Sequence, residues 1–169
     1  MLQLKALGTF VLLLVLTGCE SSVLDANLRE GFSEDVDTVN LSTVKKDISM
    51  NDDLDAENLV ITDAGEFGEF WSDLHSNRST EPGIPDIDFE NEIIIVSVMG
   101  TKPTTGYKIE INKAGAVDGQ MGINVELSSP GKGCLTGQAL TNPYHIVKME
   151  KSNLPIAFFE EEITMECIE

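Results

Sequence analysis

The chain has 169 residues, enough for one domain with short appendages, and it carries 29 acidic against 11 basic side chains. The formal net charge of −18 repels nucleic acid and anionic lipid headgroups, so neither is expected as a partner. The acidity instead favours solubility, a basic partner or surroundings of high ionic strength, and charge alone does not choose between these.

Residues 1–18 have the pattern of a secretory signal. Lys5 precedes an apolar segment, residues 6–16, which is too short for a membrane core that needs about 20 residues in a helix. The segment ends Leu16-Thr17-Gly18-Cys19, which resembles a bacterial lipobox. That resemblance implies cleavage before Cys19, lipid on its sulfur and anchoring by acyl chains. An ordinary signal peptide with an incidental cysteine is the alternative.

The rest of the chain divides into a tether and a folded domain. Removal of the leader, which holds one base and no acid, leaves 10 basic against 29 acidic side chains, a formal −19. Residues 19–35 show little periodicity and several acids, which is typical of a tether. We expect one β domain over residues 36–169. Its first strand is predicted over residues 36–44, where Val39 and Leu41 alternate with polar neighbours.

Two acidic segments have some features of calcium loops. Residues 51–57 and 86–90 are rich in acids, but both lack the glycine and the bidentate glutamate that an EF-hand requires. We therefore expect a solvated turn at the first segment, a hydrated strand edge at the second, and no bound metal.

Between these segments the pattern predicts one short strand and one helix. The strand covers residues 59–61. Asp63 then lies three residues before Glu66, the spacing of a capping box that satisfies free N–H groups at a helix start. The apolar residues that follow form one stripe at helical spacing: Phe67, Phe70, Trp71 and Leu74. A helix covering a sheet explains this stripe better than an aromatic ligand box does.

The most strongly patterned stretch contains two strands and the loop between them. Residues 93–99 are a nearly unbroken apolar run rich in β-branched side chains, which suits a strand buried on both faces. Residues 107–112 alternate between apolar and polar, which predicts a second strand, antiparallel to the first. In the intervening loop, Pro103 fixes φ and Gly106 can adopt positive φ. The loop should therefore have a defined shape.

Further short strands complete a mostly β (α+β) fold. After a turn at residues 113–119, the predicted strands cover residues 121–127, 144–149, 156–159 and 163–167. Seven or eight short strands with one covering helix indicate a small antiparallel β-sandwich or open barrel.

The cysteines fit an exported protein. If Cys19 carries lipid, Cys134 and Cys167 remain as an even pair in an oxidising compartment. A disulfide between them would close about 33 residues and stabilise the fold by roughly 4 kcal/mol on the chain-entropy estimate. It would also hold the glycine-rich segment before Cys134 to the last strand. Two free thiols are the alternative.

Enzymatic function has little support in the residues. His75 and His145 are the histidines available as a base near neutral pH. His75 would close the helix, where a cation faces the negative end of the dipole, and His145 lies in a predicted strand. The chain has no nucleophile elbow, zinc-ligand spacing or phosphate-binding loop. We expect a noncatalytic protein without a cofactor.

Several of these features together resemble the C-terminal domain of the PrcB family. They are Trp71 on the helix, Asp86-x-Asp88-Phe89, the apolar strand, Gly100-x-Lys102-Pro103-x-x-Gly106-Tyr107 and residues 141–147. The resemblance spans roughly residues 36–167. The family is named for a lipoprotein subunit of a cell-surface protease complex, and that subunit is not itself the protease. The resemblance therefore implies a noncatalytic binding role.

The loop has a second resemblance. Pro103-Thr104-Thr105-Gly106-Tyr107 is similar to the Asn-Pro-Thr-Thr-Gly-Tyr/Phe-x-Trp motif of chagasin-type inhibitors of papain-like proteases, which are β-sandwiches. Here Lys102 replaces the asparagine and Ile109 replaces the tryptophan. Asn142-Pro143-Tyr144 only echoes the Arg-Pro-Trp/Phe loop of those inhibitors. A tight connection made by proline and glycine, with no binding role, is the alternative.

Both resemblances favour a loop that faces a protease. We expect its contact residues to be Lys102, Pro103, Thr104, Thr105, Gly106 and Tyr107. The first hypothesis is a lipid-anchored protein, on the periplasmic face or outer surface of the bacterial envelope, that binds an exported protease, protease complex or other envelope protein. The second is a protease inhibitor. The third is an envelope structural lipoprotein without a protease partner.

Overall fold

The computed structural model describes residues 38–49 and 54–167. The predicted leader, lipid site and tether lie outside these residues, as do the start of the predicted first strand and the first residues of the first acidic turn. Within the described part, no helix is long and apolar enough to cross a membrane.

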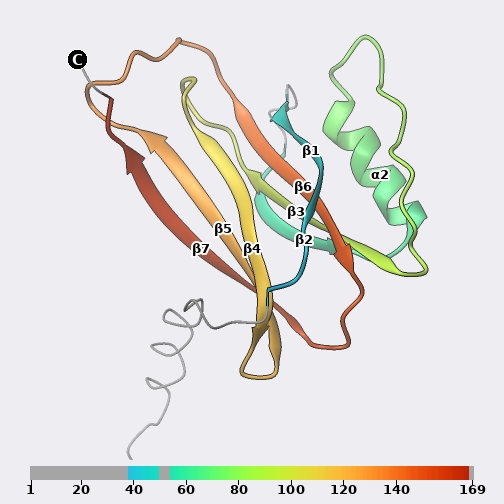
Figure 1. The fold of residues 1–169 in the computed structure, drawn as a ribbon. Helices are drawn as coiled ribbons and strands as arrows, with labels where there is room; N and C mark the ends of the chain where they lie inside the picture. Colours follow the sequence, from blue (N-terminus) through green and yellow to red (C-terminus); the bar gives the residue numbers. More distant parts are fainter. Residues whose placement is uncertain (1–37, 50–53, 168–169) are drawn as a thin grey trace, which may run out of the picture. The chain divides into compact units, whose positions relative to one another are not determined.

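The described strands form two sheets, and one helix accompanies the larger sheet (Figure 1). The four-stranded sheet has the order β1 (Ser42–Ser49), β6 (Asn142–Glu150), β3 (Glu92–Met99) and β2 (Ala56–Ile61). The three-stranded sheet has the order β4 (Lys108–Val117), β5 (Gln120–Pro130) and β7 (Ile156–Met165). All pairs are antiparallel except β5 with β7. The predicted mostly β sandwich is confirmed, and these strands close no barrel.

β3 lies inside the larger sheet and is buried on both faces, as its apolar run predicts. One set of alternate residues packs into the core between the sheets: Ile93, Ile95 and Met99. The other set packs under helix α2 (Ala64–His75): Ile94, Val96 and Val98. Burying each large apolar side chain stabilises the fold by about 1.5–3 kcal/mol, so this strand holds three layers together.

Helix α2 begins where the capping spacing predicts. The Asp63 carboxylate accepts hydrogen bonds from the backbone N–H groups of Gly65 at 2.9 Å and Glu66 at 3.0 Å. The predicted stripe packs on the larger sheet, with Phe70 half-buried and the others buried: Phe67, Trp71 and Leu74. The Trp71 indole donates to the Pro82 carbonyl at 2.9 Å and so fastens the segment after the helix. The interpretation as a covering helix is confirmed.

The prediction that β3 and β4 are antiparallel neighbours is wrong. β3 pairs with β2 on one edge and with β6 on the other, so neither edge is free for β4. Gly100, with φ of 69°, lies where the chain leaves the sheet, and residues 101–107 carry it to the smaller sheet. Alternation predicts each strand but not its partner, because pairing depends on contacts far apart in the sequence.

Three further boundaries differ from prediction. β2 begins at Ala56 rather than at residue 59, so the last two residues of the predicted first acidic turn belong to a strand paired with β3. β1 begins at Ser42 rather than at residue 36, because Thr38 forms an isolated bridge with Gly115 of β4 instead. The turn predicted at residues 113–119 shrinks to Asp118-Gly119. Both of these residues have positive φ, 47° and 79°, as a tight two-residue hairpin requires. The strands on either side are correspondingly longer.

The last two predicted strands form the single strand β7. Its parallel register with β5 continues through the exposed glutamates 160–162, where the prediction placed a break. The second acidic segment, residues 86–90, is coil and turn rather than a strand edge. There the Asp88 carboxylate accepts bonds from the Glu90 N–H at 3.1 Å and the Asn91 side chain at 2.8 Å. Among the described residues, no cluster of His, Cys, Asp or Glu is arranged to hold a metal.

His145 of β6 joins the two sheets from within the core, with 2% of its surface exposed. The Ile111 N–H of β4 donates to its Nδ1 at 2.8 Å, so Nδ1 carries no proton. Nε2 therefore carries the proton and donates to Thr43 Oγ1 at 3.0 Å. Burial, followed by the positive charge of Lys46 and opposed by Glu110, lowers the pKa of His145 to about 4.

We predict that His145 makes folding stability depend on pH. An unfolded histidine has a pKa near 6.5, so the unfolded chain takes up the proton first as the pH falls. The contribution of the neutral ring is complete above about pH 6.5 and is lost as the pH falls through about 4, roughly 3 kcal/mol in all. Urea unfolding of wild type and His145→Gln at pH 7 and pH 4 measures this effect.

The glutamine variant is the control, because its amide oxygen can still accept the Ile111 N–H while carrying no titratable group. Effects of the carboxylates act on both proteins and cancel in the comparison. The variant should lose less stability than wild type over this interval, and an equal loss would contradict the prediction.

Candidate functional site

Two loops lie at the same end of the sheets (Figure 1). Residues 100–107 join β3 to β4 and hold the predicted contact residues, and residues 131–141 join β5 to β6. The Lys102 N–H donates to the Thr141 carbonyl at 2.7 Å, and the Thr141 N–H returns a bond to the Lys102 carbonyl at 3.0 Å. We call these two segments the first and second paired loops.

Side chains extend this backbone pairing. The Thr105 N–H donates to the Gly137 carbonyl at 3.0 Å, and the Gly137 N–H donates to Thr105 Oγ1 at 2.7 Å. The Thr141 hydroxyl donates to the Thr104 carbonyl at 2.9 Å. A hydrogen bond of this kind contributes about 0.5–1.5 kcal/mol net, so together they hold the first loop in place. The sequence predicted a defined shape from proline and glycine but did not reveal that a second loop supplies these bonds.

Gly106 adopts the positive φ that glycine makes accessible at this position of the loop, at 99°. A Cβ atom at this position would lie 3.3 Å from Pro130 Cβ and 3.4 Å from Thr136 Cγ2. The backbone conformation and the available space therefore both favour glycine.

The predicted contact residues differ in what they offer a partner. Pro103 and the adjacent Thr101 are exposed, whereas Lys102 is half-buried, with its Nζ 6.0 Å from the centroid of the Tyr107 ring. Tyr107 is half-buried and packs against the core between the sheets, so its ring supports the loop. The remaining three are half-buried: Thr104, Thr105 and Gly106. Of the six predicted contact residues, only Pro103 is exposed, so fewer of them are accessible to a partner than the sequence suggested.

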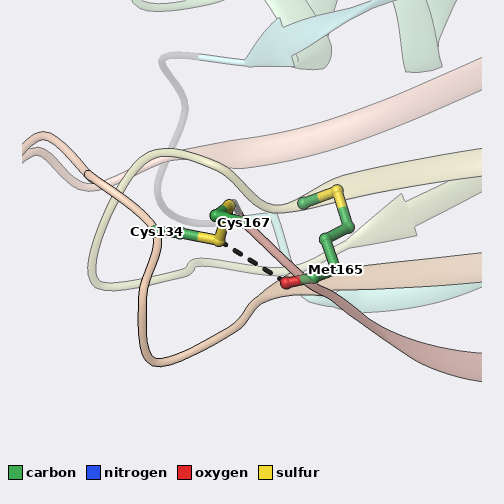
Figure 2. Close-up of a disulfide and its surroundings, with 3 residues drawn as sticks. All are labelled: Cys134, Met165 and Cys167. Carbon is green, nitrogen blue, oxygen red and sulfur yellow. Dashed lines mark hydrogen bonds between the residues drawn. A yellow bond between two sulfur atoms is a disulfide. The ribbon is translucent and has the colours of Figure 1, made fainter. Parts of the chain in front are cut away.

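A disulfide holds the second loop to the last strand. The structure joins Cys134 of this loop to Cys167 just after β7, with Cα atoms 5.0 Å apart (Figure 2). The Gly131 N–H donates to the Met165 carbonyl at 2.9 Å, and Cys134 Sγ lies 3.5 Å from the same oxygen. A Cβ at position 131 would come within 2.6 Å of that oxygen, so the close approach requires glycine.

The groups with large pKa shifts lie in β6 and not in the paired loops. They are His145, described above, and Tyr144, whose pKa burial raises to about 12. The negative charge of Asp47 adds to this rise and Arg78 opposes it. His75 is buried at the end of α2, where its Nδ1–H donates at 2.8 Å to the backbone carbonyl four residues earlier. These side chains connect elements of the fold.

The elements together define a two-sheet β domain with one covering helix. The family model described as PrcB C-terminal matches residues 93–150, which confirms the expected resemblance there. The matched residues run from β3 to β6, and both paired loops lie within them. Trp71 and the acidic segment before β3 lie outside the match, and the chagasin-like motif is not confirmed. No curated protein and no solved structure matches the chain.

Gly106→Ala should destabilise the protein more than Gly119→Ala. Both positions have positive φ, 99° and 79°, which costs an L-residue roughly 1–2 kcal/mol. At Gly106 the new Cβ would also meet Pro130 and Thr136, whereas at Gly119 nothing lies within 4 Å. Gly83→Ala is the neutral control, since that position is open and lacks positive φ. Urea unfolding ranks the three variants, and equal losses at positions 106 and 119 would refute the tight fit.

Proposed function

We propose that this chain is a noncatalytic lipoprotein of the bacterial envelope that binds an exported protein, a protease or protease complex, through residues 101–107. The PrcB C-terminal match supports an accessory role, because that family is named for a lipoprotein subunit of a protease complex. The observation that carries the proposal is the fixed position of this loop, which is bonded along its length to the second paired loop.

A loop of fixed shape suits binding for an energetic reason. Ordering a flexible loop on association costs free energy, and a preorganised loop avoids much of that cost. Here the bonds to Gly137 and Thr141 and the positive φ of Gly106 hold the backbone before a partner arrives. A rigid scaffold that presents a loop of this kind is a common arrangement for binding sites.

Lys102 gives the first loop a charge opposite to that of the whole chain. Residues 93–109 contain no acid, although the chain has 29. A carboxylate on the partner would therefore pair with Lys102 without competition from acids of the same segment. Such a pair at the rim of an interface contributes modest affinity but favours a correctly oriented encounter.

Protease inhibition is the second candidate, because the loop presents the proline-to-tyrosine part of the chagasin-like motif between two sheets. Ile109, which replaces the tryptophan of that motif, is 3% exposed in the core, so this departure leaves the loop surface unchanged. Lys102, which replaces the asparagine, does change that surface. Inhibition of papain by the purified chain would favour this candidate. Failure to capture any protease would favour an envelope structural protein.

We predict that Lys102→Glu weakens binding of the partner captured from the native envelope by about tenfold or more, which is 1.4 kcal/mol. The reason is that the variant places a repulsive charge on the proposed contact surface. Lys151→Glu makes the same charge change at an exposed position beyond the other end of β6 and should bind like wild type. Affinity capture, identification by mass spectrometry and titration of the partner provide the measurement. If both variants bind alike, the loop is only a connector.

The anchoring part of the proposal has a separate test. Cys19→Ser removes the sulfur that would carry lipid, so lipoprotein processing should stop and the protein should leave the detergent phase of a Triton X-114 partition. Cys134→Ser changes a different cysteine and should still partition with the detergent. Unchanged partitioning of Cys19→Ser would rule out the lipid anchor.

A further inference from the structure

The second paired loop carries the two most exposed large apolar side chains of the described residues. Leu135 is fully exposed, at 104%, and Leu140 is 63% exposed. Each leucine is adjacent in sequence to a residue near the first loop. Thr136 lies close to Gly106, and Thr141 is bonded to that loop through both backbone and side chain. The leucines therefore stand beside the first loop at the same end of the domain.

The second paired loop is bonded both to the first loop and to the last strand, and these bonds limit how far it can turn its two leucines toward the core. Gly137 is bonded to Thr105 of the first loop, and Cys134 is joined to Cys167 after β7. Gly131 is bonded to the last strand as well. The exposure of Leu135 and Leu140 is thus a property of a constrained segment, and exposed apolar groups held in this way are typical of an interaction site.

The stretches of sequence that contain the paired loops also differ in composition from the rest of the chain. Residues 93–109 and 127–149 contain no Asp or Glu, in a chain that has 29. The charged side chains within the paired loops are Lys102 and Lys132, and Lys132 is exposed. At physiological ionic strength, charges more than about 8 Å away are largely screened. The two lysines therefore act on a partner at short range, together with acids that the fold brings beside the loops: Glu166, next to Cys167, and Asp55, next to Ala56 at Gly100.

We propose that the paired loops form one docking surface for an acidic segment of an exported protein. An apolar side chain of that segment packs on Leu135 and Leu140, and its flanking carboxylates pair with Lys102 and Lys132. This inference rests on the proposed function and extends it by naming the chemistry of the partner. Both lysines of the loops would repel a basic segment, which the neighbouring acids Asp55 and Glu166 would attract, so acidic and basic peptides must be compared directly.

Three labelled peptides test the proposal by fluorescence anisotropy. They are Glu-Leu-Glu-Phe-Glu-Leu-Glu, the same peptide with lysine for every glutamate, and the acidic peptide with serine for every apolar residue. The chain is produced without residues 1–18 and with Cys19→Ser, so that no lipid or detergent competes for apolar surface. The first peptide should bind at least tenfold more tightly than the other two. Equal binding of all three, stronger binding of the lysine peptide, or no binding of the first overturns the proposal.

Variants then place the binding on the paired loops. Leu135→Ser combined with Leu140→Ser should weaken binding of the first peptide tenfold or more, and Lys132→Glu should weaken it severalfold. Ile84→Ser removes an apolar side chain that is 56% exposed outside both loops, and it should leave binding unchanged. Unfolding midpoints of all variants should match wild type, since the altered side chains are exposed. Equal affinity of the double leucine variant and Ile84→Ser overturns the docking surface.

Binding of the native partner separates this inference from the proposed function. If Lys102→Glu loses that partner while the double leucine variant retains it, the proposed function stands and the apolar docking surface fails. If both variants retain it, both ideas fail. Sedimentation provides a further test. If wild type sediments as a dimer and the double leucine variant as a monomer, a second copy of the chain occupies the surface, and this also overturns the proposal.

Discussion

Burial of β3 on both faces is the constraint on which the rest of the structure depends. A strand with apolar side chains on both faces needs a covering layer on each side. Helix α2 supplies one layer and the smaller sheet the other, while β2 and β6 occupy the two edges. The chain therefore has no position beside β3 for the strand that follows, and it leaves the sheet after Gly100 for the smaller sheet.

That crossing explains why the paired loops exist. The first loop connects β3 of the larger sheet to β4 of the smaller one, and the second connects β5 of the smaller sheet to β6 of the larger. Because β3 and β6 are antiparallel neighbours, the end of one lies beside the start of the other, and the two crossings meet. The disulfide and the Gly131 contact then attach the second loop to β7. Cross-linking over a separation of 33 residues is worth about 4 kcal/mol on the chain-entropy estimate.

Local patterns were sufficient for features that depend on near neighbours in the sequence. The run at residues 93–99 predicted a doubly buried strand, and Asp63 predicted the helix start. The loop pattern identified Gly106 as a residue able to adopt positive φ, which it does. Pairing could not be predicted in this way, because alternation does not say which edge a strand joins. The errors at β4, at the first strand and within β7 all arise from this limit.

In the candidate site as well, features set by sequence neighbours could be predicted, whereas contacts between distant residues could not. The first loop was found from its residues, but its support by Thr141 and Gly137 depends on pairing across more than 30 positions of sequence. The half-burial of Tyr107 follows from the packing of the two sheets, which the motif does not encode. One signal of the second loop was present in the sequence, namely the absence of acids from residues 127–149 of a strongly acidic chain.

Hydrogen exchange of the mature chain, alone and with the partner captured from the envelope, tests the central claim most directly. The account predicts added protection within residues 101–107 and 131–141, with the largest change between residues 132 and 140, and little change in α2, β2 and β7. Protection confined to the helix or to β7, with both loops exchanging as in the free chain, would contradict the account.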